Sequence, residues 1–472
     1  MLNKTKRQLF SADGRLLDAE ILRLAIPGIV TNITVPLLGW VDLMLAGRAV
    51  IADSGQSAAQ FVGAVALGSM LFNVMYWLLG FLRMSTSGLT AQAYGAKDVF
   101  RIKLLFKQSI VIALIVSLLL VLLQVPIFRL MYLIMGASDD VWSMVKTYFG
   151  ICIWGAPAVL GSYSLTGWFI GIQDTRTPMI VSISQNVVNI VCSLLFVVGL
   201  HMKIEGVALG TLIAQWVGLL IGLMFFKVKS RKFPSAHSTL SSLWFQLSAF
   251  LSVSRDIFLR TFCLVAVNLW FVSAGARQGD NILAANALLM TLFTLFSYVL
   301  DGFANAGEAL SGRYYGNIKT LPEKSDGSRM LQRVIVRLYL WGIVMAVLFT
   351  LVYLITGVSI LRLFTDSTDV LEAARPYLAW AILVPLAGFA AFVADGICIG
   401  LTRTRLMLVA SALATLVFFL VSLSPTMFSF SLLSANHALW LALILYLFIR
   451  SIVQSVKLIN PLNRGGIKFS LS

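Results

Sequence analysis

Long apolar segments recur along the whole chain, separated by short polar connections. A segment of roughly 20 residues crosses the hydrocarbon core of a bilayer as an α-helix, where every backbone group must be hydrogen-bonded internally. The pattern therefore predicts an all-α polytopic membrane protein with about twelve transmembrane helices. The predicted spans are 21–46, 61–92, 104–126, 147–172, 178–200, 205–226, 247–275, 281–312, 331–356, 377–400, 405–424 and 436–455.

The apolar pattern of the first half returns in the second half. Val62–Gly95 aligns without gaps on Leu283–Gly316. At nearly the same offset, Gly167–Arg176 aligns on Gly396–Arg405. Two matches at one offset indicate an internal duplication, which is typical of secondary transporters that bind their substrate where the repeats meet.

Basic residues concentrate in alternate connections, which is the pattern that the positive-inside rule gives to cytoplasmic loops. Both termini are therefore predicted to be cytoplasmic. An even number of spans in each half gives both halves the same orientation, so we expect two pseudo-symmetric six-helix lobes related by an axis along the membrane normal. The predicted parts are a cytoplasmic segment 1–20, a lobe 21–226, a cytoplasmic linker 227–243, a lobe 244–456 and a cytoplasmic tail 457–472.

The composition excludes a soluble protein. Of the 472 residues, 59% are hydrophobic and 12% are charged, and average chains carry about twice that charged share. The formal net charge of +16 raises the alternative of nucleic-acid binding, but the alternating basic connections explain it as a topology signal. We expect the lipid bilayer as a partner, no nucleic acid, and function as a monomer.

Several kinds of chemistry have no signature in the sequence. The first apolar segment is too long for the apolar region of a cleavable signal peptide. The four cysteines form no close-spaced pair and the three histidines are scattered, so we expect neither disulfides nor a metal site. No glycine-rich loop with Gly-Lys-Ser/Thr indicates a nucleotide site. We therefore expect a protein that is not an enzyme or an ATP-driven pump, needs no cofactor, and draws its energy from an ion gradient.

One carboxylate stands late in the first predicted span without a basic residue beside it. Ionisable groups inside spans are energetically costly and usually face a cavity. Asp42 is therefore predicted to exchange protons near physiological pH, or to hold Na⁺ if neutral oxygens converge on it. The alternative is an interfacial Asp that caps the end of the span. Pro27 and Pro36 interrupt the hydrogen bonds of the same helix and offer a way to turn protonation into bending.

Neutral oxygens that could act together with Asp42 occur in the fifth and sixth spans. Asn189 and Ser193 are one helical turn apart and share a face of the fifth span, and Thr211 lies in the sixth. Polar residues in membrane helices also join helices to one another without taking part in transport, and that is the alternative for each of them.

The second half carries a different set of acidic residues. Asp301 and Glu308 stack on one face of the eighth span, and Asp395 lies in the tenth, so the duplication has diverged. Arg83 in the second span, and Arg255, Asp256 and Arg260 at the start of the seventh, are candidate counter-charges, and Arg83 is predicted to be the one basic residue deep enough to matter. We predict that Arg83, Asp301, Glu308 and Asp395 line the substrate cavity.

Four stretches carry a resemblance to a known family. They are Asn32–Asp42, Leu82–Lys97, Leu300–Ala304 followed by Glu308, and Asn436–Leu443. Through them the chain resembles the multidrug and toxic compound extrusion (MATE) family, in particular its DinF-like branch, over essentially its whole length. The resemblance implies two six-helix lobes around a central V-shaped cavity, alternating access, and export of organic compounds in exchange for H⁺ or Na⁺.

The resemblance also assigns roles in the first lobe. Asp42 matches the first-helix carboxylate that such transporters protonate or use to bind a cation, and Pro27 matches the proline about which that helix bends. Asn189 and Thr211 match polar ligands of the same lobe. The family often has an Asp four residues after that Asn, where this chain has Ser193, so a single protonatable Asp is favoured over a tight Na⁺ site.

In the second lobe the resemblance is less complete. Asp395 resembles the tenth-helix acid of the Na⁺-coupled branch. The seventh-helix Glu that accompanies this acid in that branch is missing, and Leu264 stands near its position. The resemblance therefore gives little support for a second cation site in this lobe.

The sequence as a whole predicts a secondary active antiporter of the bacterial cytoplasmic (inner) membrane. It would export amphipathic or cationic organic compounds by alternating access, with H⁺ favoured over Na⁺ as the coupling ion. One alternative is a Na⁺-coupled exporter of the same family. Another is a lipid-linked glycan flippase, which would favour a strongly cationic cavity, and the small number of deep Arg and Lys residues argues against it.

Overall fold

The computed structural model describes the backbone of residues 12–49, 58–134, 138–233, 247–318, 320, 324–424 and 434–463. Side chains are described in these ranges except at 12–13, 35–49, 58–59, 134, 324–326 and 460–463. Helices and their short connections account for all of the described backbone. The helices are α2 (Ala12–Ala49), α3 (Ala58–Leu79), α4 (Phe81–Gly95), α5 (Val99–Leu122), α6 (Gln124–Ile134), α7 (Asp139–Cys152), η2 (Ile153–Gly155), α8 (Ala156–Gly171), α9 (Arg176–Leu194), η3 (Leu195–Gly199), α10 (Ile204–Ser230), α12 (Leu247–Ala276), α13 (Asp280–Ile318), α14 (Lys324–Phe364), α15 (Thr368–Ala374), η4 (Arg375–Tyr377), α16 (Leu378–Gly400), α17 (Thr404–Ser422) and α19 (Ala435–Asn463).

Within the described ranges, 11 helical segments are long and apolar enough to cross a membrane. They correspond one for one to the second to twelfth predicted spans, and the first predicted span, 21–46, falls within α2. The segments are Gln60–Gly95, Val99–Leu122, Asp139–Gly171, Arg176–Gly199, Ile204–Ser230, Leu247–Ala276, Asp280–Ile318, Gly327–Phe364, Thr368–Gly400, Thr404–Ser422 and Ala435–Ile459. The chain is an all-α, multi-pass membrane protein, as predicted.

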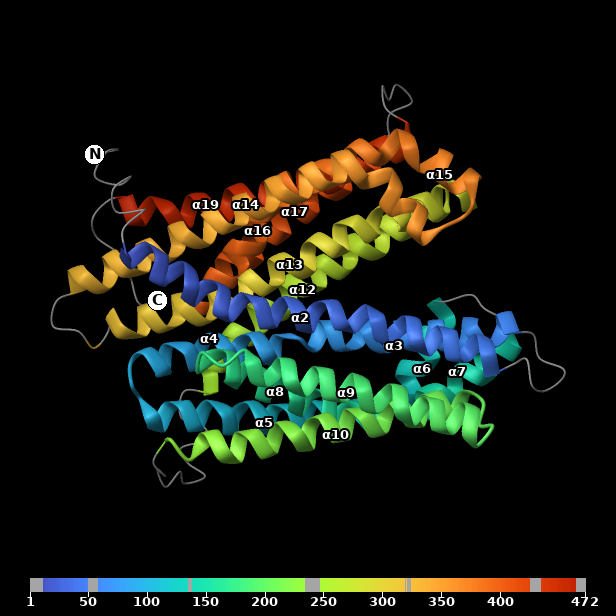
Figure 1. Ribbon diagram of the computed structural model, residues 1–472, viewed down its shortest axis with the longest axis horizontal. Helices are drawn as coiled ribbons and strands as arrows, with labels where there is room; N and C mark the ends of the chain where they lie inside the picture. Colours follow the sequence, from blue (N-terminus) through green and yellow to red (C-terminus); the bar gives the residue numbers. More distant parts are fainter. Residues whose placement is uncertain are drawn as a thin grey trace. The chain divides into compact units, whose positions relative to one another are not determined.

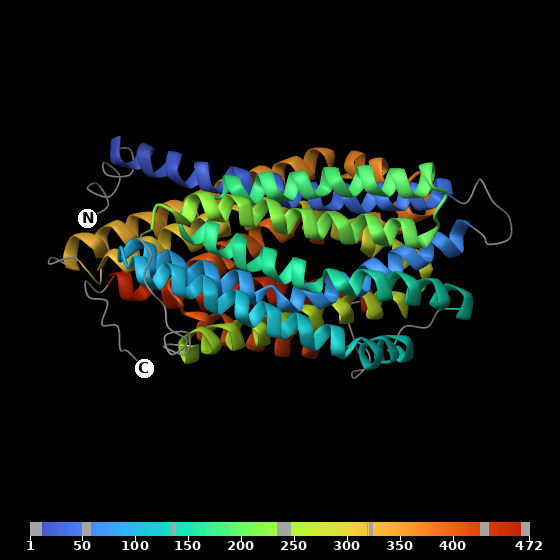
Figure 2. The same cartoon turned by 90° about the horizontal axis from the view of Figure 1, so that it is seen from below.

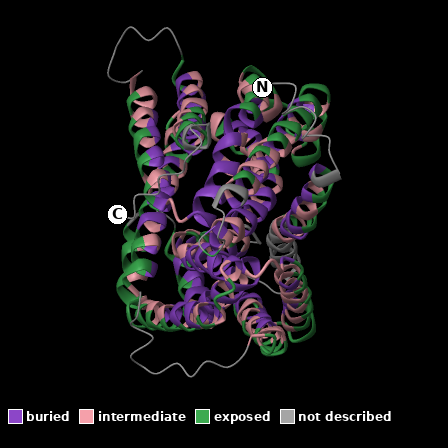
Figure 3. Cartoon of the chain, turned by 90° about the vertical axis from the view of Figure 1, so that its left-hand side faces the viewer, coloured by how far each residue is buried: buried purple, intermediate pink, exposed green. Residues whose placement is uncertain are grey.

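The outer sides of the helices carry large apolar side chains. Leu354 and Ile355 on α14, for example, are 63% and 81% exposed. Extended apolar surface of this kind is rare on soluble monomers but is what hydrocarbon requires of a membrane-spanning helix. Buried residues, purple in Figure 3, gather instead along the sides of the helices that face one another.

The described helices divide into two compact units. The N-terminal unit comprises the described residues within 30–94 and 98–251, and the C-terminal unit comprises those within 12–29, 95–97 and 252–463. In the N-terminal unit α9 lies along α10, α5 packs on α8, and α7 contacts α3 and α10 (Figures 1 and 2). In the C-terminal unit α13 lies against α14 and α16, while α19 lies against α16 and α17.

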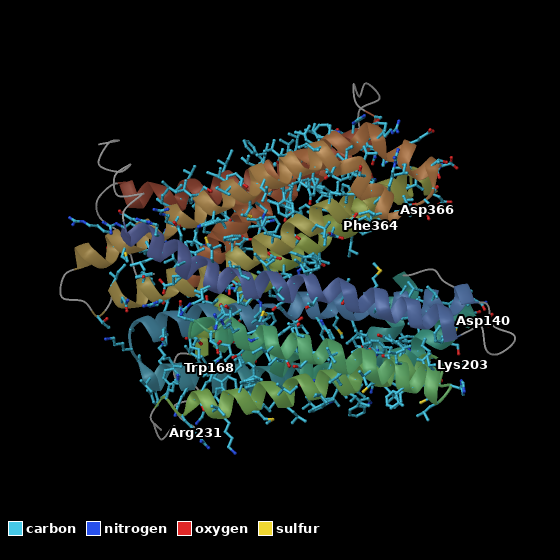
Figure 4. All side chains as sticks on the ribbon, viewed as in Figure 1. Asp140, Trp168, Lys203, Arg231, Phe364 and Asp366 are labelled. Carbon is cyan, nitrogen blue, oxygen red and sulfur yellow. The ribbon has the colours of Figure 1, made fainter. Side chains whose placement is uncertain are left out.

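Helix α10 extends from one end of the N-terminal unit to the other. Its 27 residues extend about 40 Å at 1.5 Å per residue, which is enough to cross a bilayer. Lys203 precedes it at the end of the unit where Asp140 also lies, and Arg231 follows it at the other end (Figure 4). Between these ends, the buried Trp168 packs edge-on against Phe226, with ring centroids 4.7 Å apart.

The internal duplication predicted from the sequence appears in the backbone. The offset that pairs Gly167 with Gly396 also pairs the helical stretch Asp139–Gly171 with Thr368–Gly400, and each stretch has 33 residues. Each stretch is interrupted by a 3₁₀ turn, η2 in the first and η4 in the second. These two stretches therefore repeat one another in length as well as in residues.

The turn after each of these stretches is also repeated. Gln173 and Thr402 both adopt the left-handed conformation, with φ of 68° and 55°. The amide of the next residue donates back into the helix, from Asp174 to the Phe169 carbonyl (2.9 Å) and from Arg403 to that of Cys398 (2.8 Å). This is the bonding of a Schellman C-cap, formed twice at equivalent positions.

Each repeat crosses a neighbouring helix at a glycine. A Cβ added to Gly167 on α8 would overlap the Arg83 carbonyl on α4, and one added to Gly396 on α16 would overlap the Ala304 carbonyl on α13. The alignment of Val62–Gly95 on Leu283–Gly316 pairs Arg83 with Ala304. One turn further on, Gly171 and Gly400 make the same approach to the carbonyls of Ser87 and Glu308.

The helix α2 belongs to both units. Its residues through Ile29 group with the C-terminal unit, and those from Val30 onward group with the N-terminal unit. Inside the C-terminal unit, the Asp18 carboxylate accepts hydrogen bonds from Arg337 Nη1 (2.8 Å) and Trp341 Nε1 (3.1 Å). Glu20 accepts from Arg313 Nη1 at 2.6 Å in the same way. The first turns of α2 are thereby anchored to α13 and α14.

Pro27 lies just before the point where α2 changes unit. It is buried, and its ring removes the hydrogen bond that the Arg23 carbonyl would otherwise accept. The next residue, Gly28, lies against Gly302 of α13, and a Cβ there would come within 3.2 Å of the Gly302 Cα. A helix-weakening residue and a close helix crossing thus stand side by side in α2.

Candidate functional site

The structure brings together the three polar residues predicted in the fifth and sixth spans. Asn189 on α9 donates from Nδ2 to Thr211 Oγ1 on α10 at 3.1 Å. Ser193 donates from Oγ to Asn189 Oδ1 at 3.5 Å, and Thr211 donates to the Val207 carbonyl at 3.0 Å. Asn189 and Ser193 are buried and Thr211 is half-buried. We call Asn189, Ser193 and Thr211 the amide–hydroxyl cluster, and all of its hydrogen bonds are between neutral groups.

Local backbone features position this cluster. Gly210 on α10 lies against Ser193, and a side chain at Gly210 would overlap the Ser193 hydroxyl. The absence of a side chain there lets α9 and α10 approach closely enough for Asn189 to reach Thr211. Immediately after the cluster, α9 continues into the π-helical turn η3 (Leu195–Gly199), a type of distortion that is frequent at functional sites.

Asp42 lies on the part of α2 that belongs to the N-terminal unit, which also holds the amide–hydroxyl cluster. Its backbone is helical, whereas its side chain and that of Pro36 lie outside the described side chains. The last described stretch before them contacts α9, because Asn186 Nδ2 donates to the Thr34 carbonyl at 3.3 Å. This contact is about two helical turns before Asp42.

The predicted cavity residues are distributed over both units. Arg83 lies on α4 in the N-terminal unit and is half-buried. Asp301 and Glu308 lie on α13 in the C-terminal unit, where Asp301 is half-buried and Glu308 is 1% exposed. Asp395 lies on α16 of the same unit.

Asp395 is the centre of a buried charged cluster. Its Oδ2 accepts from Nη2 of Arg260 on α12 and from Nη2 of Arg450 on α19, the latter at 2.6 Å. Its Oδ1 accepts from Gln454 Nε2 at 2.9 Å. The four residues are between 0% and 7% exposed. We call Arg260, Asp395, Arg450 and Gln454 the arginine–aspartate cluster.

This cluster corrects one expectation and adds two residues. Arg83 was expected to be the one deep basic residue, but that is wrong, because Arg260 and Arg450 are more fully buried than Arg83. Arg450 and Gln454 did not emerge from the sequence as site residues. A signal existed for Arg450, which interrupts the apolar residues of the last predicted span, where an ionisable residue is costly.

The cluster leaves little room for a cation on Asp395. Three N–H donors already occupy its two oxygens, and two of them carry positive charge. A sodium ion would have to compete with two guanidinium groups and the Gln454 amide for the two carboxylate oxygens. Among the residues that the structure describes, no group of three or more His, Cys, Asp and Glu side chains is placed to hold a metal ion.

The duplicated helices, each half with a buried polar cluster, define a polytopic membrane protein built from two repeats, the architecture of secondary transporters. A family model described as MatE matches the chain twice, over residues 27–195 and 257–423, so each half matches separately. The chain belongs to the MatE family, as predicted.

Relatives support this assignment over nearly the full length. The DNA damage-inducible protein F of Escherichia coli (strain K12) is 38% identical over 436 residues, which cover 92% of this chain and 90% of that protein. A probable multidrug resistance protein NorM of a Synechococcus strain is 23% identical over 437 residues, covering 89% of each chain. Among solved structures, a crystal structure of MATE in the bent conformation matches with a TM-score of 0.80 and 18% identity, covering 95% of this chain and 96% of that one.

Proposed function

We propose that this protein is a secondary active antiporter that exports amphipathic or cationic organic compounds from the bacterial cytoplasm in exchange for H⁺. It would act as a monomer in the cytoplasmic membrane with both termini inside the cell. Membership of the MatE family and the printed description of the NorM relative as a probable multidrug resistance protein support the substrate class. The alternating basic connections of the sequence support the orientation.

The observation that carries the choice of H⁺ is the difference between the two polar clusters. The amide–hydroxyl cluster contains no carboxylate, so Asp42 on α2 would act without a second acid from Asn189, Ser193 or Thr211. The acid of the C-terminal unit, Asp395, is neutralised by two arginines. A single carboxylate suits one proton better than Na⁺, which needs several oxygen ligands.

The proposed cycle uses the division of α2 between the units. Asp42 takes up a proton from outside, and α2 bends near Pro27, where the helix lacks a hydrogen bond. Bound substrate is then displaced outward, and the proton leaves inward after the lobes rock. Pro36, nearer to Asp42, is the second position at which bending is proposed. The anchoring of Asp18 and Glu20 supports a bend, because it fixes one end of α2 to the C-terminal unit.

We assign substrate contacts to Arg83, Asp301 and Glu308. The two acids on α13 would attract a cationic substrate in the C-terminal unit, and Arg83 is assigned a substrate contact in the N-terminal unit. Asp395 is not included, because its oxygens are occupied by Arg260, Arg450 and Gln454.

The test is efflux of ethidium, a fluorescent organic cation, from proteoliposomes under an imposed pH gradient or an imposed Na⁺ gradient. The wild type should respond to the pH gradient, and Asp42→Asn should abolish the response. Glu205→Gln is a control in the same unit, since Glu205 is exposed in the first turn of α10 and has no proposed role in transport. It should keep proton-driven efflux.

Each other outcome contradicts a named part of the proposal. Efflux that depends strictly on Na⁺ would show the Na⁺-coupled alternative. Normal efflux by Asp42→Asn under the pH gradient would remove Asp42 from the mechanism. Movement of a fluorescent glycan-linked lipid between leaflets, without ethidium efflux, would favour the flippase alternative, which the two buried arginines make worth testing.

A further inference from the structure

The arginine–aspartate cluster holds unequal numbers of opposite charges. Arg260 and Arg450 each donate one Nη2 to the same oxygen of Asp395. Among the described residues, Asp395 is the only carboxylate within ion-pair distance of either arginine. Two guanidinium groups therefore face one carboxylate, and the cluster has one positive charge in excess.

The neighbouring acid on α12 does not correct this imbalance. Asp256 lies one helical turn before Arg260 and is also buried. Its Oδ1 accepts from Arg255 at 3.1 Å, and its Oδ2 accepts from Thr404 at 3.2 Å. The Asp256 charge is thus paired with the exposed Arg255 rather than with the cluster.

Both arginines also keep buried hydrogen-bond donors without a partner. The Nε atoms of Arg260 and Arg450 are inaccessible to solvent and have no acceptor among the described residues. The guanidinium of Arg450 lies over the ring of Tyr446, 5.3 Å from its centroid. Within the same described set, the Tyr446 hydroxyl and Gln454 Oε1 are buried without a hydrogen-bond partner as well. The excess positive charge and the unpaired Nε–H donors belong to the same two arginines, so one additional anion would satisfy both.

A buried positive charge without a counter-charge costs several kcal/mol, and buried charges are normally paired. We propose that the arginine–aspartate cluster binds a small inorganic monovalent anion, with chloride as the physiological occupant. A monovalent anion neutralises the single excess charge and accepts from the unpaired N–H groups. The burial of all four residues favours a small inorganic ion over the charged end of a bulky organic molecule. This site is independent of the transport proposal.

A pair in the same unit provides an internal control. Arg337 donates to Asp18 in a one-to-one pair, and Asp18 also accepts from Trp341. Its charges balance, so no anion is expected there. Arg337→Gln therefore removes one half-buried, ion-paired guanidinium from the C-terminal unit without altering the arginine–aspartate cluster.

The experiment measures saturable binding of ³⁶Cl⁻ to the purified full chain in detergent. The midpoint of thermal unfolding is followed in parallel while sodium chloride replaces sodium gluconate at constant ionic strength. A ligand that binds the folded state raises the midpoint as its concentration passes its Kd. Wild type and Arg337→Gln should bind ³⁶Cl⁻ and show the rise. Arg450→Gln, whose cluster charges balance, should show neither.

Asp395→Asn changes the cluster in the opposite direction. This variant raises the excess from one positive charge to two. It should therefore bind ³⁶Cl⁻ more tightly, with a Kd lowered by about tenfold or more because the two arginines are buried. Failure of the wild type to bind ³⁶Cl⁻ saturably overturns the proposal whatever the variants do. Equal chloride responses in wild type, Arg450→Gln and Arg337→Gln also overturn it, since they indicate a general salt effect. If Arg450→Gln does not fold, Asp395→Asn and the wild-type binding decide.

Discussion

The two halves of this protein repeat the same helices but place different chemistry between them. In the N-terminal unit, Asn189, Ser193 and Thr211 form a neutral set of hydrogen bonds. In the C-terminal unit, Asp395 is held between two buried arginines. The equivalent glycine crossings and C-caps show that the backbone framework has been kept while the ionisable groups have diverged. The two halves have therefore kept the same helix crossings from the duplication, but they differ in the ionisable groups that lie between the helices.

The largest effect on stability is expected from removing the acid of the charged cluster. Asp395→Ala leaves two buried guanidinium groups without their carboxylate and should lower the free energy of unfolding by about 3–5 kcal/mol. The measurement is denaturant unfolding in detergent micelles. Joint replacement of Arg260 and Arg450 by Met and of Asp395 by Leu should recover most of the loss, because no buried charge then remains unpaired. A small effect of Asp395→Ala would mean that water reaches the cluster.

The next prediction tests whether the helix crossings of the two halves are equivalent. Gly167→Leu and Gly396→Leu each push a side chain into a neighbouring carbonyl and should lower the free energy of unfolding by about 1–3 kcal/mol. The two losses should agree closely if the crossings are equivalent. Gly150→Leu is the control, because no atom lies within 4 Å of a Cβ at that position, and it should have little effect. Unequal losses at Gly167 and Gly396 would show that the two helix crossings are not equivalent.

A smaller effect is expected in the neutral cluster. Thr211→Val keeps the shape of the side chain but removes the acceptor of Asn189 Nδ2, and should lower the free energy of unfolding by about 1 kcal/mol. If the oxygens of this cluster act together with Asp42, Thr211→Val should also weaken proton-driven ethidium efflux. A loss of unfolding free energy as large as that of Asp395→Ala would contradict the assignment of the amide–hydroxyl cluster as a set of neutral groups.

The smallest effect is expected at Ser193. Its hydroxyl lies 3.5 Å from Asn189 Oδ1, at the long limit for a hydrogen bond, so Ser193→Ala should change the free energy of unfolding by about 0.5 kcal/mol or less. Proton-driven efflux should be close to that of the wild type, measured in the same proteoliposomes. Strong loss of efflux at unchanged stability would instead identify Ser193 as a direct participant in coupling.

The helices and their duplication could be predicted from the sequence because the signals are local. A span is a run of apolar residues, and the likeness of Gly167–Arg176 to Gly396–Arg405 is visible in the letters themselves. The pairing of Asn189 with Thr211 was suggested by family resemblance and is present as a hydrogen bond. The role of Asp42 stays a prediction, since its side chain lies outside those that the structure describes.

The partners of Asp395 could not be predicted in the same way. Arg450 is 55 residues further along the chain and Arg260 is 135 residues earlier, and no spacing rule connects three different helices. Helical periodicity places residues on a face but does not say which other helix that face meets. Arg450 could have been singled out as an ionisable residue within an apolar span, but its pairing with Asp395 required the packing of α16 against α19.

The anchoring of α2 has a consequence for the order of assembly. Asp18 leaves the ribosome well before its partner Arg337, which follows 319 residues later. At about 5–20 residues per second, the start of α2 waits roughly 15–65 s before its ion pair can form. The start of α2 therefore cannot complete its packing until the second repeat has been synthesised as far as α14, so the N-terminal half is not finished as a module before translation of the C-terminal half has begun.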